Sequence, residues 1–201
     1  MNFRIPLAFF FLIFICGQIQ AQKIKTKGDL SFLKEVKNIE LAFDYNNMGV
    51  GKYDKEEDYL NDRVEKRNQK EPGAGDEWKA SWINDRQERF EPNFTELFNK
   101  HINDDGIKAS KDLESAPVKL LVKTTYTEPG FNVGVVRKSA HINVEILYID
   151  NETNKTLASM DINKVPGRGA MGYDFDTGYR LEEAYAKLGK EVAKYISKKV
   201  L

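Results

Sequence analysis

Cysteine and histidine are scarce in this 201-residue chain: Cys16 is the only cysteine, and His101 and His141 are the only histidines. Cleavage of residues 1–21 as a signal peptide would remove Cys16, and no cysteine would then remain to form a disulfide, act as a thiolate nucleophile or ligate a metal. The two histidines lack the spacing of an HExxH metal site, and the chain contains no GxSxG serine elbow. We therefore expect no metal and no cofactor.

A hydrophobic run long enough to cross a membrane is also missing. Residues 7–16 are wholly apolar, but a membrane-spanning helix needs about 20 residues. Arg4 precedes this run, and a more polar stretch after it ends at Ala21. The order of positive charge, apolar run and small residue is typical of a secretory signal peptide. We therefore expect residues 1–21 to be a signal peptide cleaved after Ala21, and the protein not to be integral to a membrane.

Lipidation of Cys16 is the competing interpretation of the same segment. Bacterial lipoprotein signals carry a small residue immediately before the lipidated cysteine, whereas Ile15 occupies that place here. The pattern therefore favours export of a cleaved protein that is periplasmic or associated with the cell envelope, and lipidation stays the alternative. The remaining chain, residues 22–201, has a length typical of a single domain.

An excess of charge of either sign is lacking as well. The chain has 31 basic and 31 acidic residues, and loss of Arg4 with the signal leaves a net charge of −1. The two signs are interleaved along the chain, which is typical of a solvated surface. Without a concentrated basic footprint, nucleic acid is not an expected partner.

Hydrophobic periodicity is present and predicts the elements of the fold. Alternation with a period of two predicts strands over residues 36–45, 118–127, 140–149 and 156–165. Helical spacing predicts helices over residues 54–70, 76–103 and 178–199. Pro92 should split or kink the second helical region. The order of strand, helices, three strands and helix predicts an α+β two-layer sandwich, with a mostly antiparallel four-stranded sheet and helices on one face.

Two glycine-bearing loops, residues 128–138 and 165–177, should meet at one end of this sheet, because three consecutive strands run antiparallel. Functional residues often occupy loops held by a rigid scaffold. The loops supply a candidate binding edge made of Phe131, Asn132, Arg137, Arg168, Met171, Tyr173, Asp174 and Asp176. In the competing interpretation, their apolar side chains only cover the end of the core.

Other motifs carry less information. Gly167, Gly169 and Gly172 match GxGxxG, but a dinucleotide site needs this motif inside a βαβ unit, which the predicted strand order lacks. Asp174 and Asp176 do not form a full calcium loop, and helix capping is the simpler role for Asp176 or Thr177. Two tryptophans, Trp78 and Trp82, could stack on sugar rings if exposed, but their helical spacing favours core packing.

The segments EPGFNVG (128–134), RKSAHINVEI (137–146) and PGRGAMGYDFDTGYRLEEAYAKLGKEVAKYI (166–196) resemble an uncharacterised family of exported proteins from gut and environmental bacteria. The last 85 or so residues are more distantly similar to TolB-N-terminal-like and curli-secretion-like periplasmic lipoproteins. The lipidated cysteine of those lipoproteins has no convincing match here. The resemblance implies a cell-envelope location, an α+β sandwich, and assembly or binding in preference to catalysis.

These observations lead to three functional hypotheses. The first is a non-catalytic periplasmic or cell-envelope accessory or binding protein whose partner is an unknown envelope protein or glycan. The second is a hydrolase acting on an envelope glycan or peptide, which requires a water-accessible cleft with acids of perturbed pKa. The third is a structural subunit that self-associates through a sheet edge. The oligomeric state stays open.

Overall fold

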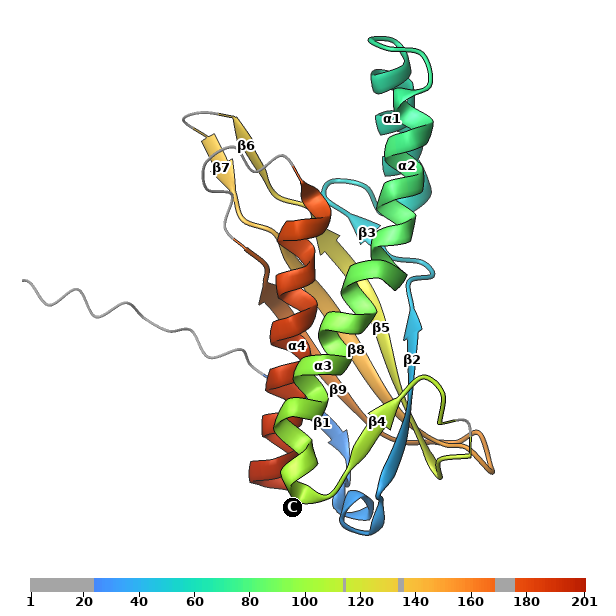
Figure 1. The fold of residues 1–201 in the computed structure, drawn as a ribbon, viewed down its shortest axis with the longest axis vertical. Helices are drawn as coiled ribbons and strands as arrows, with labels where there is room; N and C mark the ends of the chain where they lie inside the picture. The colour runs from blue at the N-terminus through green and yellow to red at the C-terminus, as the bar shows by residue number, and fades with distance from the viewer. Residues whose placement is uncertain (1–23, 114, 134–135, 169–175) are drawn as a thin grey trace, which may run out of the picture.

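The computed structural model describes residues 24–113, 115–133, 136–168 and 176–201. Its main sheet has seven strands in the order β1-β9-β8-β5-β2-β4, with β3 also pairing with β5 (Figure 1). The strands are β1 (Ile24–Gly28), β2 (Asn38–Asp44), β3 (Gly49–Val50), β4 (Lys108–Ser110), β5 (Val118–Glu128), β8 (His141–Asp150) and β9 (Thr156–Pro166). A separate hairpin is formed by β6 (Phe131–Val133) and β7 (Val136–Lys138).

Within the described residues, four α-helices accompany the sheet, with short helical turns between elements. The α-helices are α1 (Glu56–Asn68), α2 (Ala74–Asp85), α3 (Glu91–Ile102) and α4 (Thr177–Lys199). The turns are the 3₁₀ helices η1 (Ser31–Glu35) and η3 (Asn103–Asp105) and the π-helical turn η2 (Arg86–Phe90). Among the residues described, no helix combines the length and the apolar composition that crossing a membrane requires.

The predicted α+β class is confirmed, and the sheet is larger than expected and mixed. The pairings β5–β8, β8–β9 and β1–β9 are antiparallel, as the predicted zigzag requires. Strand β2 pairs in parallel with both β4 and β5, and β3 also runs parallel to β5. A long helical connection returns the chain to the end of the sheet from which β2 started, and only such a crossover allows β2 and β5 to run parallel.

The edge strands explain why the sequence predicts only four strands. β1 has the sequence IKTKG and β4 has three residues, so neither shows the apolar alternation of a half-buried strand. Short, charged strands are typical of sheet edges, where they discourage pairing with other chains. Residues 24–35, for which periodicity predicts no element, therefore form an edge strand and a 3₁₀ turn.

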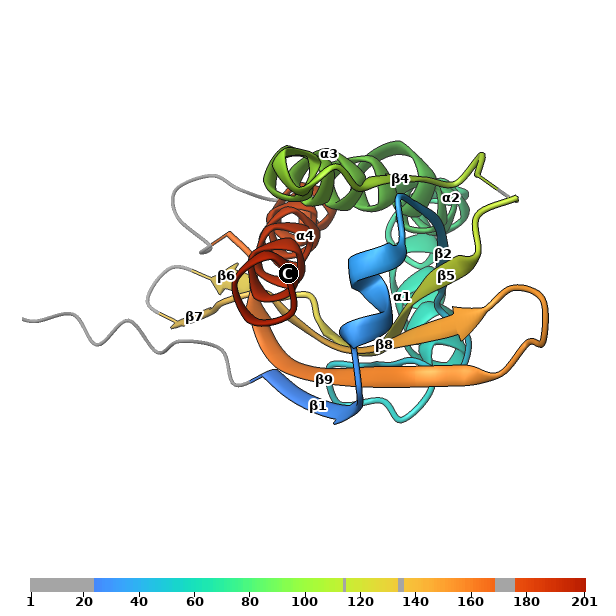
Figure 2. The ribbon, with the colours of Figure 1, turned by 90° about the horizontal axis from the view of Figure 1, so that it is seen from below.

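Helices α3 and α4 cover one face of the sheet and form most of the core with it (Figure 2). The apolar stripe of α4 is buried against the sheet and α3, with exposed fractions of 0–1% for Leu181, Tyr185, Leu188, Val192 and Ile196. Gly189 allows the two helices to approach closely, because a Cβ there would collide with the carbonyl oxygen of Phe94. Phe90 stacks on Tyr185 with ring centroids 4.7 Å apart.

Helices α1 and α2 form an antiparallel hairpin, here called the helical arm, that projects beyond the end of the sheet (Figure 1). Gly73 precedes α2 as its N-cap with a φ of 90°, a backbone conformation that suits glycine. At the base of the arm, Glu56 accepts hydrogen bonds from Trp82 Nε1 at 2.6 Å and from Arg86 NH2. The Arg86 guanidinium also lies 4.6 Å from the centroid of the Tyr45 ring. These contacts join both helices of the arm to the body of the domain.

The predicted break at Pro92 takes the form of a π-helical turn. Pro92 lies in the first turn of α3, where its missing N–H is tolerated, and η2 connects α2 to α3. Single π-helical turns widen a helix locally and are frequent at functional sites. The turn carries Arg86 and Phe90, which anchor the arm and the core respectively.

Candidate functional site

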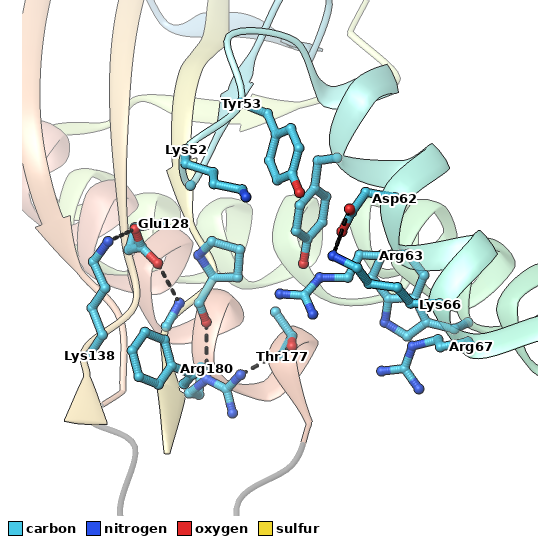
Figure 3. A pocket seen from close by; sticks show the side chains of 16 residues that line it. Lys52, Tyr53, Asp62, Arg63, Lys66, Arg67, Glu128, Lys138, Thr177 and Arg180 are labelled. Atoms are coloured by element: carbon cyan, nitrogen blue, oxygen red, sulfur yellow. Dashed lines mark hydrogen bonds and ion pairs between the residues drawn. The ribbon is translucent and has the colours of Figure 1, made fainter. Parts of the chain in front are cut away.

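A cleft of about 460 Å³ lies between the helical arm and the end of the sheet (Figure 3). Its walls come from α1 and α2 on one side and from the β3 turn, the base of the β6–β7 hairpin and the first turn of α4 on the other. This volume is within the range of about 300–1,000 Å³ found for small-molecule sites. We call it the basic cleft, for the charges described next.

Positive charge dominates the described lining of the basic cleft. Six cationic residues line it, which are Lys52, Arg63, Lys66, Arg67, Lys138 and Arg180. Two acidic residues, Asp62 and Glu128, also line it, so the formal charge of the lining is 6 − 2 = +4. A chain with no overall excess charge thus concentrates positive charge at one concave surface. Such concentration attracts anions and raises their local concentration.

Both acidic residues of the cleft are bound to lysines. Asp62 accepts a hydrogen bond from Lys66 Nζ at 2.7 Å, and this bond is the largest cause of the lowered pKa of Asp62. Glu128 is 4% exposed and forms an ion pair with Lys138 of the hairpin. Glu128 also accepts hydrogen bonds from Gly130 N at 3.2 Å and Tyr126 Oη at 3.3 Å. These ion pairs neutralise both acidic side chains of the cleft, and the pair of Glu128 with Lys138 also attaches the hairpin to β5.

Three other cations lie on aromatic rings instead. Lys52 Nζ is 5.1 Å from the centroid of the Tyr53 ring. On α1, the guanidinium of Arg63 is 5.3 Å from the centroid of Tyr59. The guanidinium of Arg67 is 5.2 Å from that of Trp78. Within the described part of the chain, none of these three cations forms an ion pair with a carboxylate.

The three rings are neighbours and form one row along the cleft. Tyr59 lies between the others, with its ring centroid 5.8 Å from that of Tyr53 and 5.8 Å from that of Trp78. We call this arrangement, three contiguous rings each carrying a cation, the cation row. Cation–π contact leaves the N–H groups at the edge of a guanidinium available to an anion, whereas an ion pair occupies them. The cation row is therefore a set of hydrogen-bond donors held in position to bind an anion.

Arg180 connects the base of the β6–β7 hairpin to the start of α4 within one wall of the cleft. This side chain is 4% exposed, and its Nε donates to the carbonyl of Pro129 at 3.1 Å. Its NH2 group donates to Thr177 Oγ1 at 3.1 Å. The backbone carbonyl of Arg180 accepts a hydrogen bond from Arg168 N at 3.0 Å. The start of α4 and the described parts of both glycine-bearing loops therefore lie together, as the antiparallel zigzag predicts.

The structure places the predicted loop residues at this end in different environments. Phe131 is 41% exposed and lines the basic cleft. The backbones of Asn132 and Arg137 pair across the β6–β7 hairpin, and Arg137 is exposed. Met171, Tyr173 and Asp174 lie outside the described residues.

Arg168 and Asp176 interact at the start of α4. The Arg168 guanidinium lies 4.0 Å from the centroid of the Tyr179 ring. Asp176 caps α4, accepting from Tyr179 N at 3.1 Å, and forms an ion pair with Arg89 at 2.7 Å. The capping role predicted for Asp176 is confirmed. Whether any of the eight predicted residues binds a ligand stays a prediction.

Sequence reasoning missed the contribution of the helical arm. Tyr59, Arg63 and Arg67 recur every four residues and therefore share one face of α1. That repeat was the available signal, but interleaved charge on a helix with few apolar anchors is also the pattern of a solvated surface helix. Of the two tryptophans, Trp82 is buried, as its spacing predicts, and Trp78 is half-buried and lines the cleft.

Two carboxyl groups outside the cleft lining have raised pKa values. Burial raises the pKa of Asp85 to about 6, against the opposing effect of Arg89, whose Nε is 3.1 Å away. Burial also raises the pKa of Glu182. Neither residue lines the basic cleft. No group of three or more metal-ligating side chains occurs among the residues for which positions are described.

Comparison with known proteins adds little to this geometry. No protein-family model matches the chain, and no curated protein matches it. Among solved structures, the dodecameric PelC of Paraburkholderia phytofirmans is similar over 84% of this chain and 98% of its own, at 9% identity and a TM-score of 0.39. A putative neuraminyllactose-binding hemagglutinin homolog from Helicobacter pylori covers 81% of this chain and 87% of its own, at 12% identity and a TM-score of 0.38. A DUF330 protein from Xanthomonas campestris covers 79% and 80%, with the same identity and TM-score.

These likenesses are too weak to transfer a role or a fold family. The predicted similarity to TolB-N-terminal-like lipoproteins is not among them.

Proposed function

We propose that this protein is an exported, non-catalytic accessory or binding protein of the bacterial cell envelope, and that it holds an anionic ligand in the basic cleft. The observation that carries the proposal is the cation row, in which Lys52, Arg63 and Arg67 lie on aromatic rings without a carboxylate partner among the described residues. Charge-assisted hydrogen bonds to such groups are among the strongest that proteins make. Grouping like charges costs stability unless an anion neutralises them.

The chemistry of the cleft supports binding over hydrolysis. Acid–base catalysis at a glycan or peptide needs an acid whose pKa lies near the working pH. Asp62 has a lowered pKa because of its hydrogen bond with Lys66, and Glu128 is buried in an ion pair with Lys138. Asp85, whose pKa of about 6 would suit an acid, lies outside the cleft lining. The hydrolase hypothesis is the weaker alternative.

The location is proposed from the N-terminal sequence. Residues 1–21 have the order of a signal peptide, which predicts a mature chain beginning at Gln22. Expression of the whole chain in a Gram-negative bacterium, followed by osmotic shock and mass spectrometry of the N-terminus, tests this. A protein retained in the cytoplasm with residues 1–21 intact would contradict the proposed export.

Anion binding is tested by isothermal titration with two small polyanions, tripolyphosphate and citrate. Replacing Arg63 and Arg67 by glutamine should weaken binding of at least one polyanion by about tenfold or more, because each charged hydrogen bond contributes about 1.5–3 kcal/mol. The control replaces Lys198 and Lys199, which are exposed at the other end of α4, and it changes the net charge equally. Equal weakening by both double variants would show a general charge effect and refute the cleft as the site.

A further inference from the structure

We infer that the ligand of the basic cleft is a carboxylated oligosaccharide, bound with successive acidic groups along the cation row. This inference rests on the proposed function and narrows it to one chemical class. Three features support it: cations on both walls of the cleft, their spacing along the row, and the aromatic surface and hydroxyl groups between them.

Positive charge comes from both walls. Lys66 and Lys138 are paired with Asp62 and Glu128, whereas Arg63 and Arg67 on the arm and Lys52 on the opposite wall have no carboxylate partner among the described residues. The close view shows Lys52 on one side of the cavity and Arg63 and Arg67 on the other (Figure 3). A ligand with several separated negative charges can contact cations on both walls of this cleft of about 460 Å³ at once, whereas an anion with a single charge pairs with one or two neighbouring cations. The lining therefore fits a ligand with several separated negative charges.

The spacing of the cation row suits one acidic group per sugar unit. Arg63 and Arg67 are four residues apart on α1, which places their Cα atoms about 6 Å apart along the helix axis. The rings beneath them, Tyr59 and Trp78, have centroids 5.8 Å apart. This interval is close to the length that one pyranose unit adds to a polysaccharide chain. A chain of uronic acids carries one carboxylate on every unit, so it can offer a separate carboxylate to each of the two guanidinium groups.

The groups between the cations suit sugar rings. Tyr53, Trp78 and Phe131 supply aromatic surface that is half-buried or exposed at the cleft. Sugar rings offer apolar C–H faces for such surfaces, and their hydroxyl groups can pair with tyrosine hydroxyls and backbone groups. An acidic peptide also carries spaced carboxylates, but its backbone offers no comparable apolar ring face. The combination of fixed cations and aromatic surface therefore favours an acidic glycan.

The test compares four probes by isothermal titration against the purified protein. The probes are trigalacturonate, its fully methyl-esterified form, tri-glutamate and tripolyphosphate. We expect trigalacturonate to bind at least about tenfold more tightly than the ester, which keeps the rings and loses the charge, and than tri-glutamate, which keeps the charge and loses the rings. Binding should also change the fluorescence of Trp78, and it should weaken as salt concentration rises.

Variants locate the binding. Replacing Arg63 and Arg67 by glutamine should weaken trigalacturonate binding by about 100-fold, at about tenfold for each charged contact. Replacing Lys198 and Lys199 by glutamine should change it less than about threefold, since exposed charges at a distance are screened. Each double variant should fold normally, because both pairs of side chains are exposed and no described ion pair is lost with Arg63 or Arg67. Circular dichroism checks this.

The outcomes separate this inference from the proposed function. Equal binding of the ester, or equal or tighter binding of tri-glutamate or tripolyphosphate, would overturn the acidic-glycan inference. If Arg63 and Arg67 were still required in that case, the proposed anion-binding function would stand. If no charged probe binds, or if binding is unchanged when Arg63 and Arg67 are replaced, both the acidic-glycan inference and the proposed function would be overturned. Selective, arginine-dependent binding of trigalacturonate supports both.

Discussion

Glu56 should decide whether the helical arm is held in place, and replacing it by alanine tests this directly. Glu56 begins α1 and accepts hydrogen bonds from Trp82 Nε1 at 2.6 Å and from Arg86 NH2 at 2.6 Å. The side chains of Glu56 and Arg86 are only 16% and 18% exposed. Removing the carboxylate therefore leaves a buried indole N–H without its acceptor and a largely buried guanidinium without its counter-ion.

The expected cost follows from these two losses. A buried donor left unpaired costs about 1–3 kcal/mol, and breaking a fully buried ion pair costs about 3–5 kcal/mol. Some solvent reaches this pair, and Arg86 keeps its contact with the Tyr45 ring, so the second loss is smaller here. We expect the Glu56→Ala variant to lose about 3 kcal/mol of unfolding free energy. For a chain of this size, that loss corresponds to a fall in Tm of about 6–12 °C.

The assay is urea unfolding followed by tryptophan fluorescence and by far-ultraviolet circular dichroism. Trp78 and Trp82 are the only tryptophans, and both lie on α2, so fluorescence reports on the arm. If the arm loosens first, the fluorescence transition of Glu56→Ala should precede the circular dichroism transition. The same variant should bind anions more weakly, because Arg63 and Arg67 depend on the position of α1.

A matched control separates this effect from the general value of a negative charge at a helix start. Glu57 is the next residue and is exposed, and its replacement by alanine should cost about 0.3–1 kcal/mol through the helix dipole alone. If Glu56→Ala were no less stable than Glu57→Ala and bound anions normally, the role assigned to Glu56 would be wrong.

Three further predictions concern other parts of the domain. Asp85 has a pKa of about 6 in the folded protein, above its ordinary 3.8, so its contribution to stability is fully present below pH 3.8 and is lost as the pH rises through 6. When the pH is lowered from 7.5 to 4.5, the unfolding free energy of the unmodified protein should therefore increase by about 2 kcal/mol relative to that of Asp85→Asn, as measured by urea unfolding. A difference that stays constant with pH would contradict this prediction. Gly189→Ala should lose about 1–2 kcal/mol, because its new methyl group meets the Phe94 carbonyl, and a rise in Tm would show that α3 and α4 separate at no cost. Phe131→Asp should leave Tm nearly unchanged, because the side chain is 41% exposed, yet it should weaken anion binding measured by titration. The control variant Val136→Asp should not weaken anion binding, because Val136 is exposed on the same hairpin but lies outside the cleft lining. Equal weakening by the two variants would count against a contact between Phe131 and the ligand.

Local patterns predicted most elements because each depends on residues close together in the chain. The alternation in residues 118–127 and the helical stripe of residues 178–199 correspond to β5 and α4 within a residue or two. β2 was also predicted as a strand, but its parallel pairing was not. Alternation shows which side of a strand faces the core, and it is the same for either direction of pairing.

The candidate site was predicted in part, and the reason lies in the range of its contacts. Antiparallel strands bring successive loops to one end whatever their sequences, and the hydrogen bonds from Gly167 N to the Ala140 carbonyl at 2.9 Å and from Arg180 to the Pro129 carbonyl agree with this. No comparable rule of chain direction predicts where the arm lies. Its position depends on Glu56 and on the π-helical turn, which join segments about thirty residues apart.

Hydrophobic periodicity and chain direction are local properties, and they were enough to predict the α+β class, the positions of the main strands and helices, and the proximity of the two loops. The position of the α1 charges beside a cavity depends on how separate elements pack, and the even mixture of acids and bases in the sequence had indicated a solvated surface instead. Asp62 and Glu128 are bound to lysines, while Arg63 and Arg67 lie on Tyr59 and Trp78. Which charges are neutralised depends on distances between side chains from separate elements, and a linear pattern does not contain those distances.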